Sequence, residues 1–350
     1  MIPAFFGLSG PSLTQAERAF FARHPPAGYI LFRRNIETPA QVQALTESLR
    51  DLAGNPRLPI LIDQEGGRVA RLPSPPWPAF PAQAVFARVW ERAPATAMVA
   101  ARANAQAIAQ TLRSLGITVD CLPVVDVPVA GSHAIIGDRA LGEEPLQVAA
   151  LGRAILDGLQ AGGVVGVVKH VPGHGRATAD SHLDLPVVTA SEAELEADLA
   201  PFIRLADAPM AMTAHVLYTA WDRELCASLS PTIIRDIIRG RIGFDGLLMS
   251  DDLGMQALGR QPGGNRMAGR ALGVLAAGCD IALHCSGDLA EMAEVAAALP
   301  AIGQAARRRL EEAMAWAEQP WRGAEAGAEV VSVETLLARR DSLLEAATVA

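Results

Sequence analysis

Short apolar runs alternate along this chain with longer segments in which apolar and polar positions follow a helical spacing. Eight runs of strand length can be traced, at residues 2–6, 29–32, 59–62, 117–127, 164–168, 210–213, 246–249 and 280–283. Strands that are apolar almost throughout are typical of a parallel sheet covered by helices. A doubly wound sheet is the competing arrangement. Eight β/α units in 350 residues favour a single-domain α/β fold, the (β/α)8 TIM-type barrel.

Capping signals mark the start of several expected helices. Thr14 followed by Glu17 and Ser191 followed by Glu194 have the spacing of capping boxes. A cap residue followed by proline at the first helical position occurs at 38–39 and again at 230–231. Other helices are expected at 95–115, 145–161 and from about residue 289. The proline-rich stretch 72–82 is predicted to be a surface excursion.

The same pattern suggests how the chain is divided. No linker long enough to separate two domains occurs, so residues 1–320 are predicted to form the catalytic barrel. Residues 321–350 are rich in Ala and Glu and are predicted to be a C-terminal helical tail that packs on the barrel or trails it.

Composition narrows the possible partners. The net charge of −8 and the sequence pI near 5.4 leave no basic excess, which argues against a nucleic-acid partner. The N-terminus lacks the features of a leader, and no run of about 18 apolar residues suggests a membrane span. Four scattered cysteines are expected to be buried and reduced. A cytoplasmic protein is predicted, and its oligomeric state is left open.

Polar residues lie at the C-terminal end of most of the predicted strands, which is the rim where barrel enzymes place their sites. These residues are Asp63, Asp126, Lys169, His170, His215, Asp251 and His284. The densest group follows the fifth strand, because three of the seven histidines fall within the thirteen residues 170–182. We therefore expect the chemistry on this loop.

Three motifs carry a family resemblance. The stretches KHVPGHGRATADSHLDLP, IDQEGGRVARL and RDIIRGRIGFDGLLMSDDLGM occur in the expected order. They resemble glycoside hydrolase family 3, in particular its single-domain bacterial β-N-acetylhexosaminidases, over roughly residues 2–285. Several family members carry the acid/base carboxylate on a second domain. This chain has an Asp-x-His loop instead.

Asp251 is the candidate nucleophile. It follows the apolar run 246–249, so its carboxylate is expected at the barrel rim, and the resemblance implies that it attacks the sugar. The alternative is a helix N-cap. That alternative, or a supporting hydrogen bond, is favoured for Asp252.

His182 is the candidate acid/base, with Asp180 two residues before it. Histidine titrates near neutrality, so it can protonate a leaving oxygen and then deprotonate water. A neighbouring carboxylate can orient the ring and stabilise its charged form. The resemblance implies this Asp–His dyad. The alternative is a loop histidine that only forms structural hydrogen bonds.

The resemblance also implies sugar-binding residues, which are Asp63, Arg71, Arg139, Lys169 and His170. Each could instead belong to a salt-bridge network at the rim. Within 64–68 the glycines are expected to make a turn, and Glu65 is expected to pair with Arg68. His174 is expected to shape the loop rather than react, and residues 171–182 are hypothesised to close over bound sugar.

Two positions in the loop depart from the family pattern. Val171 stands where Phe is common, which is expected to alter packing under the loop. Arg176 stands where small or acidic residues are frequent, and it could meet an anionic aglycone.

The leading functional prediction is a retaining exo-β-N-acetylglucosaminidase without metal or cofactor. By resemblance, its substrates are N-acetylglucosaminyl-anhydromuramyl species, the muropeptides of cell-wall recycling. A β-glucosidase or a β-glycoside phosphorylase is the alternative within the family. Outside it stand a non-catalytic sugar-binding barrel and a zinc hydrolase, whose ligands would be His170, His174, His182, His215 and Asp251.

Overall fold

Eight parallel strands close into a barrel in the computed structural model, which describes residues 1–319, 321 and 331–349. The order around the barrel is β1-β12-β11-β9-β7-β6-β3-β2, and β1 closes it by pairing with β12, where Ala4 faces Ala282. The strands are β1 (Ile2–Gly7), β2 (Pro26–Leu31), β3 (Ile60–Ile62), β6 (Val119–Asp120), β7 (Val165–Val171), β9 (Met210–Thr213), β11 (Leu247–Asp252) and β12 (Ile281–His284). The predicted (β/α)8 barrel is confirmed.

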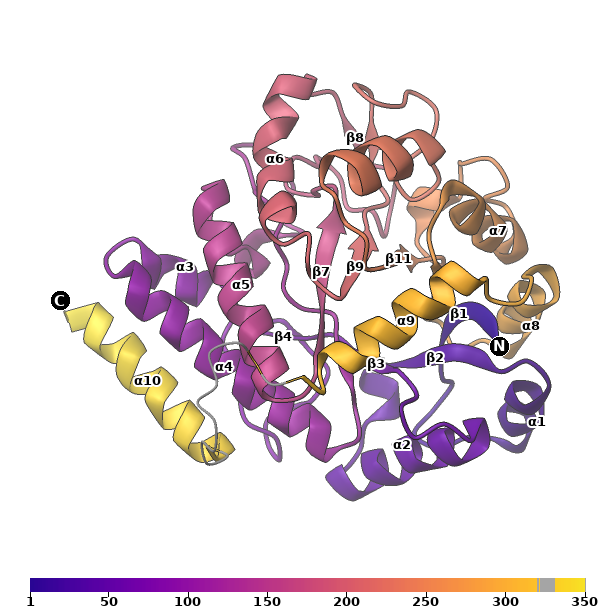
Figure 1. Cartoon of the computed structure of the whole chain (residues 1–350), viewed down its shortest axis with the longest axis horizontal. Helices are drawn as coiled ribbons and strands as arrows, with labels where there is room; N and C mark the ends of the chain where they lie inside the picture. Colours follow the sequence, from indigo (N-terminus) through magenta and orange to yellow (C-terminus); the bar gives the residue numbers. More distant parts are fainter. Residues whose placement is uncertain (320, 322–330, 350) are drawn as a thin grey trace.

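Helices surround the strands (Figure 1). They are α1 (Gln15–Arg23), α2 (Pro39–Ala53), α3 (Ala84–Trp90), α4 (Pro94–Ser114), α5 (Pro145–Ala161), α6 (Glu192–Arg204), the π-helix η3 (Ile233–Arg241), α7 (Met267–Ala277), α8 (Leu289–Ala298), α9 (Gln304–Trp316) and α10 (Val333–Val349). Both predicted capping boxes are present, at Thr14 and at Ser191. Among these helices, none combines the length and the apolar composition that crossing a membrane requires.

Two predictions about local structure are wrong in part. The fourth strand spans two residues instead of 117–127, because Pro123 has no N–H for the sheet; pairing resumes at a single bridge between Val124 and Lys169. The proline-rich stretch is a loop, but it does not merely cross the surface, because Trp77 and Phe80 are buried in the core.

Apolar side chains fill the barrel and also pack between strands and helices. Helix α9 closes the end where the strands begin, since Leu310 and Ala313 join the interior cluster and the Ile302 N–H donates to the Met1 carbonyl. The candidate site lies at the opposite end, where the strands finish.

Helix α10 lies beside α4 near the edge of the molecule (Figure 1). Leu336 is buried there, and the Arg340 guanidinium donates to the side-chain oxygen of Asn104 at 3.0 Å. Most of residues 320–330 lie outside the described residues, so the boundary at 320 between barrel and tail stays a prediction.

Helices α4 and α5 pack closely at Gly158, and this contact gives a stability prediction. A Cβ at residue 158 would lie 2.4 Å from the Arg102 carbonyl oxygen of α4. Gly158→Ala is therefore expected to lower the free energy of unfolding by about 1–3 kcal/mol through overpacking. Urea unfolding measures this, with Gly10→Ala as the control, because a Cβ at residue 10 meets nothing within 4 Å. Equal stability of the two variants would contradict the packing.

Candidate active site

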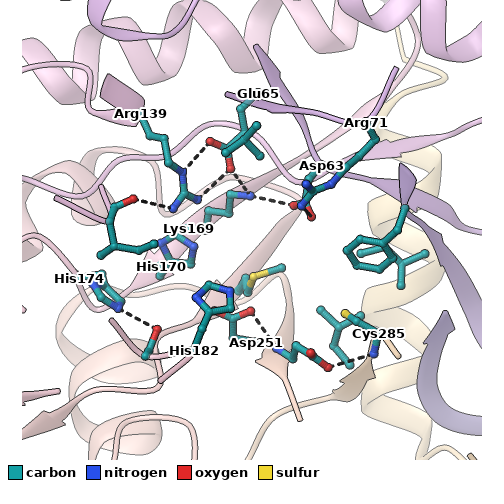
Figure 2. Close-up of a pocket in the computed structure, with 18 of the residues that line it drawn as sticks. Asp63, Glu65, Arg71, Arg139, Lys169, His170, His174, His182, Asp251 and Cys285 are labelled. Atoms are coloured by element: carbon teal, nitrogen blue, oxygen red, sulfur yellow. Dashed lines mark hydrogen bonds and ion pairs between the residues drawn. The ribbon is translucent and has the colours of Figure 1, made fainter. Parts of the chain in front are cut away.

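A pocket of about 410 Å³ lies at the ends of the strands. It is lined by seven of the eight residues predicted for the site: Asp63, Arg71, Arg139, Lys169, His170, His182 and Asp251. Asp180, the eighth, contacts His182 from outside the lining. These residues come from the end of β3, the hairpin after it, η2 (Gly137–Arg139), β7, the loop after β7 and β11. Figure 2 shows their side chains directed toward one cavity.

A network of buried charges forms one wall of this pocket (Figure 2). The Lys169 ammonium lies 3.0 Å from Asp63 Oδ1 and 2.7 Å from Glu65 Oε1. Arg71 reaches the second oxygen of Asp63 at 3.0 Å, and Arg139 binds both oxygens of Glu65 at 2.8 and 2.9 Å. Each buried charge is therefore paired, which is the condition for burying it.

The pairing sets the charge state of these groups. Burial alone would raise the pKa of Asp63, but Lys169 and Arg71 outweigh it and hold this pKa well below its ordinary value. Burial would lower the pKa of Lys169, yet the carboxylates of Asp63 and Glu65 raise it above the ordinary value. Carboxylate and ammonium are both charged at neutral pH.

The expected pair between Glu65 and Arg68 is wrong. Glu65 lies in β4 (Gln64–Gly66) and points into the pocket, toward Lys169 and Arg139. Arg68 lies in the turn to β5 (Val69–Ala70) and binds Asp138 at 2.7 Å. The glycines do make the turn, with φ of 92° at Gly66 and 57° at Gly67.

His170 is oriented by a buried carboxylate. Its Nδ1 lies 2.7 Å from Asp126 Oδ2, while Asp126 Oδ1 accepts the backbone N–H groups of His170 and His174. Burial would raise the pKa of Asp126, but the His170 ring and these N–H donors lower it to about 2. Because the carboxylate accepts, Nδ1 of His170 carries hydrogen and Nε2 remains for a ligand.

His174 lines the pocket as part of the loop's internal bonding. Its Nε2 lies 3.2 Å from the Ser181 hydroxyl, and burial lowers its pKa to about 4. The ring is therefore neutral at pH 7. It ties the start of the loop to the residue before His182.

Asp251 presents a half-buried carboxylate near the end of β11. One oxygen accepts the Asp252 N–H at 2.8 Å. Burial raises the pKa of Asp251, but His170, His215 and the Asp252 N–H together bring it below the ordinary value. The helix-cap alternative fails for both aspartates, because β11 continues through Asp252 and the next helical turn begins at Gln256. Asp252 accepts the N–H groups of Gly254 and Cys285, which is the supporting role expected of it.

His182 lies beside Asp251 in the pocket (Figure 2). Its Nδ1 is 2.8 Å from Asp180 Oδ1, and its side chain is 62% exposed. Burial raises the pKa of Asp180, but the backbone N–H and ring of His182 bring it below the ordinary value. Nδ1 therefore donates to a carboxylate, and Nε2 faces the open pocket.

His215 supports the strand that carries Asp251 from below. Its Nε2 lies 3.1 Å from the Asp252 carbonyl and its Nδ1 2.7 Å from the Ser228 hydroxyl. The carbonyl can only accept, so Nε2 carries hydrogen and Ser228 donates to Nδ1. His215 and His284 are fully buried and lie outside the pocket lining, so the rim position of these two residues did not make them pocket residues. Across the described ranges, no three or more His, Cys, Asp or Glu side chains are grouped to hold a metal ion.

The two positions that depart from the family pattern point into the protein. Val171 is buried in the core. Arg176 binds Asp198 of α6 at 2.7 Å and the Glu194 carbonyl at 3.0 Å, and it does not line the pocket. The expectation that Arg176 meets an aglycone is therefore wrong.

Sequence reasoning missed three residues of the site. Glu65 was assigned to architecture, and Asp126 was placed at the rim without a role. Arg34 lines the pocket, and nothing in its local sequence indicated this. The signal available for Asp126 was its position at the end of the fourth apolar run, whose strand is the neighbour of the strand that bears His170.

The chain is similar to known proteins in sequence and in fold. The family model "Glycosyl hydrolase family 3 N terminal domain" matches residues 7–316. The β-hexosaminidase of Bordetella avium is 40% identical over 288 residues, which are 81% of this chain and 80% of that protein. The solved structure of NagZ from Neisseria gonorrhoeae with N-trifluoroacetyl-D-glucosamine is similar at TM-score 0.83 and 31% identity, covering 99% of this chain and 98% of that one.

A longer structure is similar as well. A glycoside hydrolase family 3 β-N-acetylglucosaminidase from Paenibacillus sp. has a TM-score of 0.82 and 30% identity. The match covers 99% of this chain and 66% of that one.

The carboxylate of Asp126 gives a prediction about pH. Its pKa in the folded protein is depressed, so the stability that it contributes is present above the ordinary pKa and is lost as the pH falls toward 2. Between pH 4.5 and pH 2.5 this group should account for about 1.5 kcal/mol of the fall in unfolding free energy. Asp126→Asn should be less stable at pH 7 and should lose about that much less over the same interval.

Urea unfolding at several pH values makes the comparison. Asp236→Asn is the control, because Asp236 pairs with Arg235 on the exposed surface and should leave the acid dependence nearly unchanged. An Asp126→Asn profile parallel to that of the parent protein would contradict the prediction.

Proposed function

The chain belongs to glycoside hydrolase family 3, and on that premise we propose that it is a retaining exo-β-N-acetylglucosaminidase. One observation carries the proposal. A half-buried carboxylate, Asp251, shares a pocket with His182, whose Nδ1 is held by Asp180 and whose Nε2 has no partner among the described residues. This pairs an anionic nucleophile with a group that can both give and take a proton.

In the first step of the proposed reaction, Asp251 attacks the anomeric carbon. The carbon–oxygen bond to the leaving group breaks, and that oxygen takes the proton from Nε2 of His182. For this the ring must start as imidazolium, with Nδ1 donating to the Asp180 carboxylate. A covalent glycosyl ester on Asp251 results.

In the second step, the neutral His182 acts as a base. Nε2 takes a proton from water, and the water oxygen bonds to the anomeric carbon while the ester bond to Asp251 breaks. Two displacements at one carbon return the original configuration. The ring ends as imidazolium, ready for the next cycle.

The charged wall is proposed to hold the sugar. Lys169 has three N–H donors, of which Asp63 and Glu65 take two, so one remains for a hydroxyl. His170 offers Nε2, and Asp63, Arg71 and Arg139 provide further polar atoms along the same side. The N-acetyl preference is proposed from the relatives, which are named β-hexosaminidases and a β-N-acetylglucosaminidase.

The natural substrates are proposed to be N-acetylglucosaminyl-anhydromuramyl saccharides and muropeptides of cell-wall recycling, processed in the cytoplasm. Phosphorolysis is the second candidate. It is favoured by one observation, since the exposed His182 ring would not repel an anionic acceptor as a carboxylate would.

Substrate choice gives the first functional prediction. The nitrophenyl β-N-acetylglucosaminide should be cleaved rapidly in the presence of a chelator and without phosphate, and the matching β-glucoside should not. Nitrophenol release measures both. Dependence on phosphate would replace hydrolysis with phosphorolysis, and dependence on added metal would revive a metal hydrolase. Binding of N-acetylglucosamine with no turnover of any substrate would indicate a sugar-binding protein.

Substitution of the two proposed reacting groups should give different outcomes. Asp251→Asn is expected to lower kcat by about a thousandfold or more, without rescue, because no glycosyl ester can form. His182→Ala should lower it about a hundredfold. Added azide should restore turnover and yield a β-glycosyl azide, since azide needs no base.

His24→Gln is the matched control, because His24 packs on Phe20 of α1 and does not line the pocket. Product analysis by NMR identifies the azide and its configuration. If azide rescued Asp251→Asn and gave the β-azide, the roles assigned to the two residues would have to be exchanged. If azide did not rescue His182→Ala, the acid/base role of His182 would be removed.

A further inference from the structure

Arg34 differs from the other cations of the pocket. Five Lys or Arg side chains line it, and four of them are neutralised by carboxylates: Lys169 by Asp63 and Glu65, Arg71 by Asp63, Arg139 by Glu65 and Arg68 by Asp138. Arg34 makes no ion pair with any residue that the structure describes.

Backbone carbonyls hold the Arg34 guanidinium in place. Nε donates to the Leu8 carbonyl at 2.7 Å, and Nη2 donates to the Cys285 carbonyl. These two carbonyls follow β1 and β12, which are neighbours in the barrel. The guanidinium carbon lies 5.0 Å from the centre of the Phe32 ring. Nη1 has no partner in the described part of the chain, so an oriented donor with its charge faces the pocket.

The position of Arg34 indicates which part of a substrate it meets. Arg71 also lies over the Phe32 ring, 5.3 Å from its centre, and Arg71 binds Asp63 of the charged wall. Arg34 is thus separated from the proposed sugar-binding groups by one aromatic ring. It is exposed, whereas Lys169 and Glu65 are buried. A sugar seated against the buried wall would therefore leave Arg34 in the outer part of the pocket, free to meet the rest of a longer substrate.

Asp252 is the carboxylate that could compete for Arg34. It acts on Arg34 electrostatically but forms no ion pair with it among the described residues, and its Oδ1 accepts the N–H groups of Gly254 and Cys285. It therefore leaves the Nη1 donor of Arg34 free.

We propose that Arg34 binds a carboxylate of the leaving group and makes the enzyme prefer anionic aglycones. This inference rests on the proposed glycosidase function. A guanidinium whose fork is already oriented gains a charge-assisted hydrogen bond from a carboxylate and much less from a neutral ester.

The test compares two disaccharides in which N-acetylglucosamine is β-linked to a muramyl residue. One has a free lactyl carboxylate and the other its methyl ester. The parent protein should show a kcat/KM about 5- to 20-fold higher for the acid, as a charge-assisted hydrogen bond at a partly exposed site predicts. In Arg34→Gln this ratio should fall to about one. Rising salt should reduce the ratio in the parent protein.

Arg33→Gln is the matched control. It removes the same charge one residue earlier, but Arg33 does not line the pocket and donates to the Ile36 carbonyl. It should keep the parent ratio. Arg34→Lys should retain part of the preference, which keeps the test valid should Arg34→Gln fold poorly. In a third substrate the lactyl group is amidated by a peptide. This substrate shows whether Arg34 binds a carboxylate of the peptide or that of the lactyl group.

The outcomes separate the two proposals. A parent ratio near one for every acid tested, or an unchanged ratio in Arg34→Gln, would overturn the role of Arg34 while N-acetylglucosamine release continued. No release from the disaccharides or from the aryl glycoside would overturn the glycosidase function itself, and this inference with it.

Discussion

The pocket depends on burying a lysine without losing its charge. Removing an ammonium from water costs several kcal/mol, and Lys169 recovers this by lying between Asp63 and Glu65. Those two carboxylates need further cations in turn, which Arg71 and Arg139 supply. The chain of pairs joins β3, the hairpin after it, β7 and η2. The position of each segment is therefore set by the charges of the others.

The histidines show a second constraint. Asp126 fixes one ring nitrogen of His170 and Asp180 fixes one of His182, whereas both ring nitrogens of His215 are fixed, by the Asp252 carbonyl and by Ser228. A fixed partner determines which nitrogen carries hydrogen and what the other can do. Histidine thus has three proposed roles here. His170 offers an acceptor to the sugar, His182 carries a proton at the pocket mouth, and His215 supports the strand that bears Asp251.

Features that depend on neighbours in sequence were predictable. Thr14 and Ser191 cap their helices because the capping box involves residues three apart, and α5 has the predicted bounds because proline starts it and a glycine follows it. The barrel followed from eight apolar runs. The residues brought to the pocket followed from the motifs, although their roles stay proposals.

Features that depend on distant partners were not predictable. Glu65 and Arg68 are close in sequence, but the hairpin turns one inward and leaves the other at its tip. Arg176 looked available for a ligand until α6 placed Asp198 against it. Arg34 is anchored by carbonyls that follow two other strands. The local sequence gives no sign of this, because every residue has a main-chain acceptor. The loop that bears His182 is tied in the same way, as the N–H groups of Gln256 and Ala257 donate to the carbonyls of His182 and Ser181. Because these ties use the main chain, the exposed side chain of Gln256 can be replaced while the loop that bears His182 stays joined to the segment after Asp251.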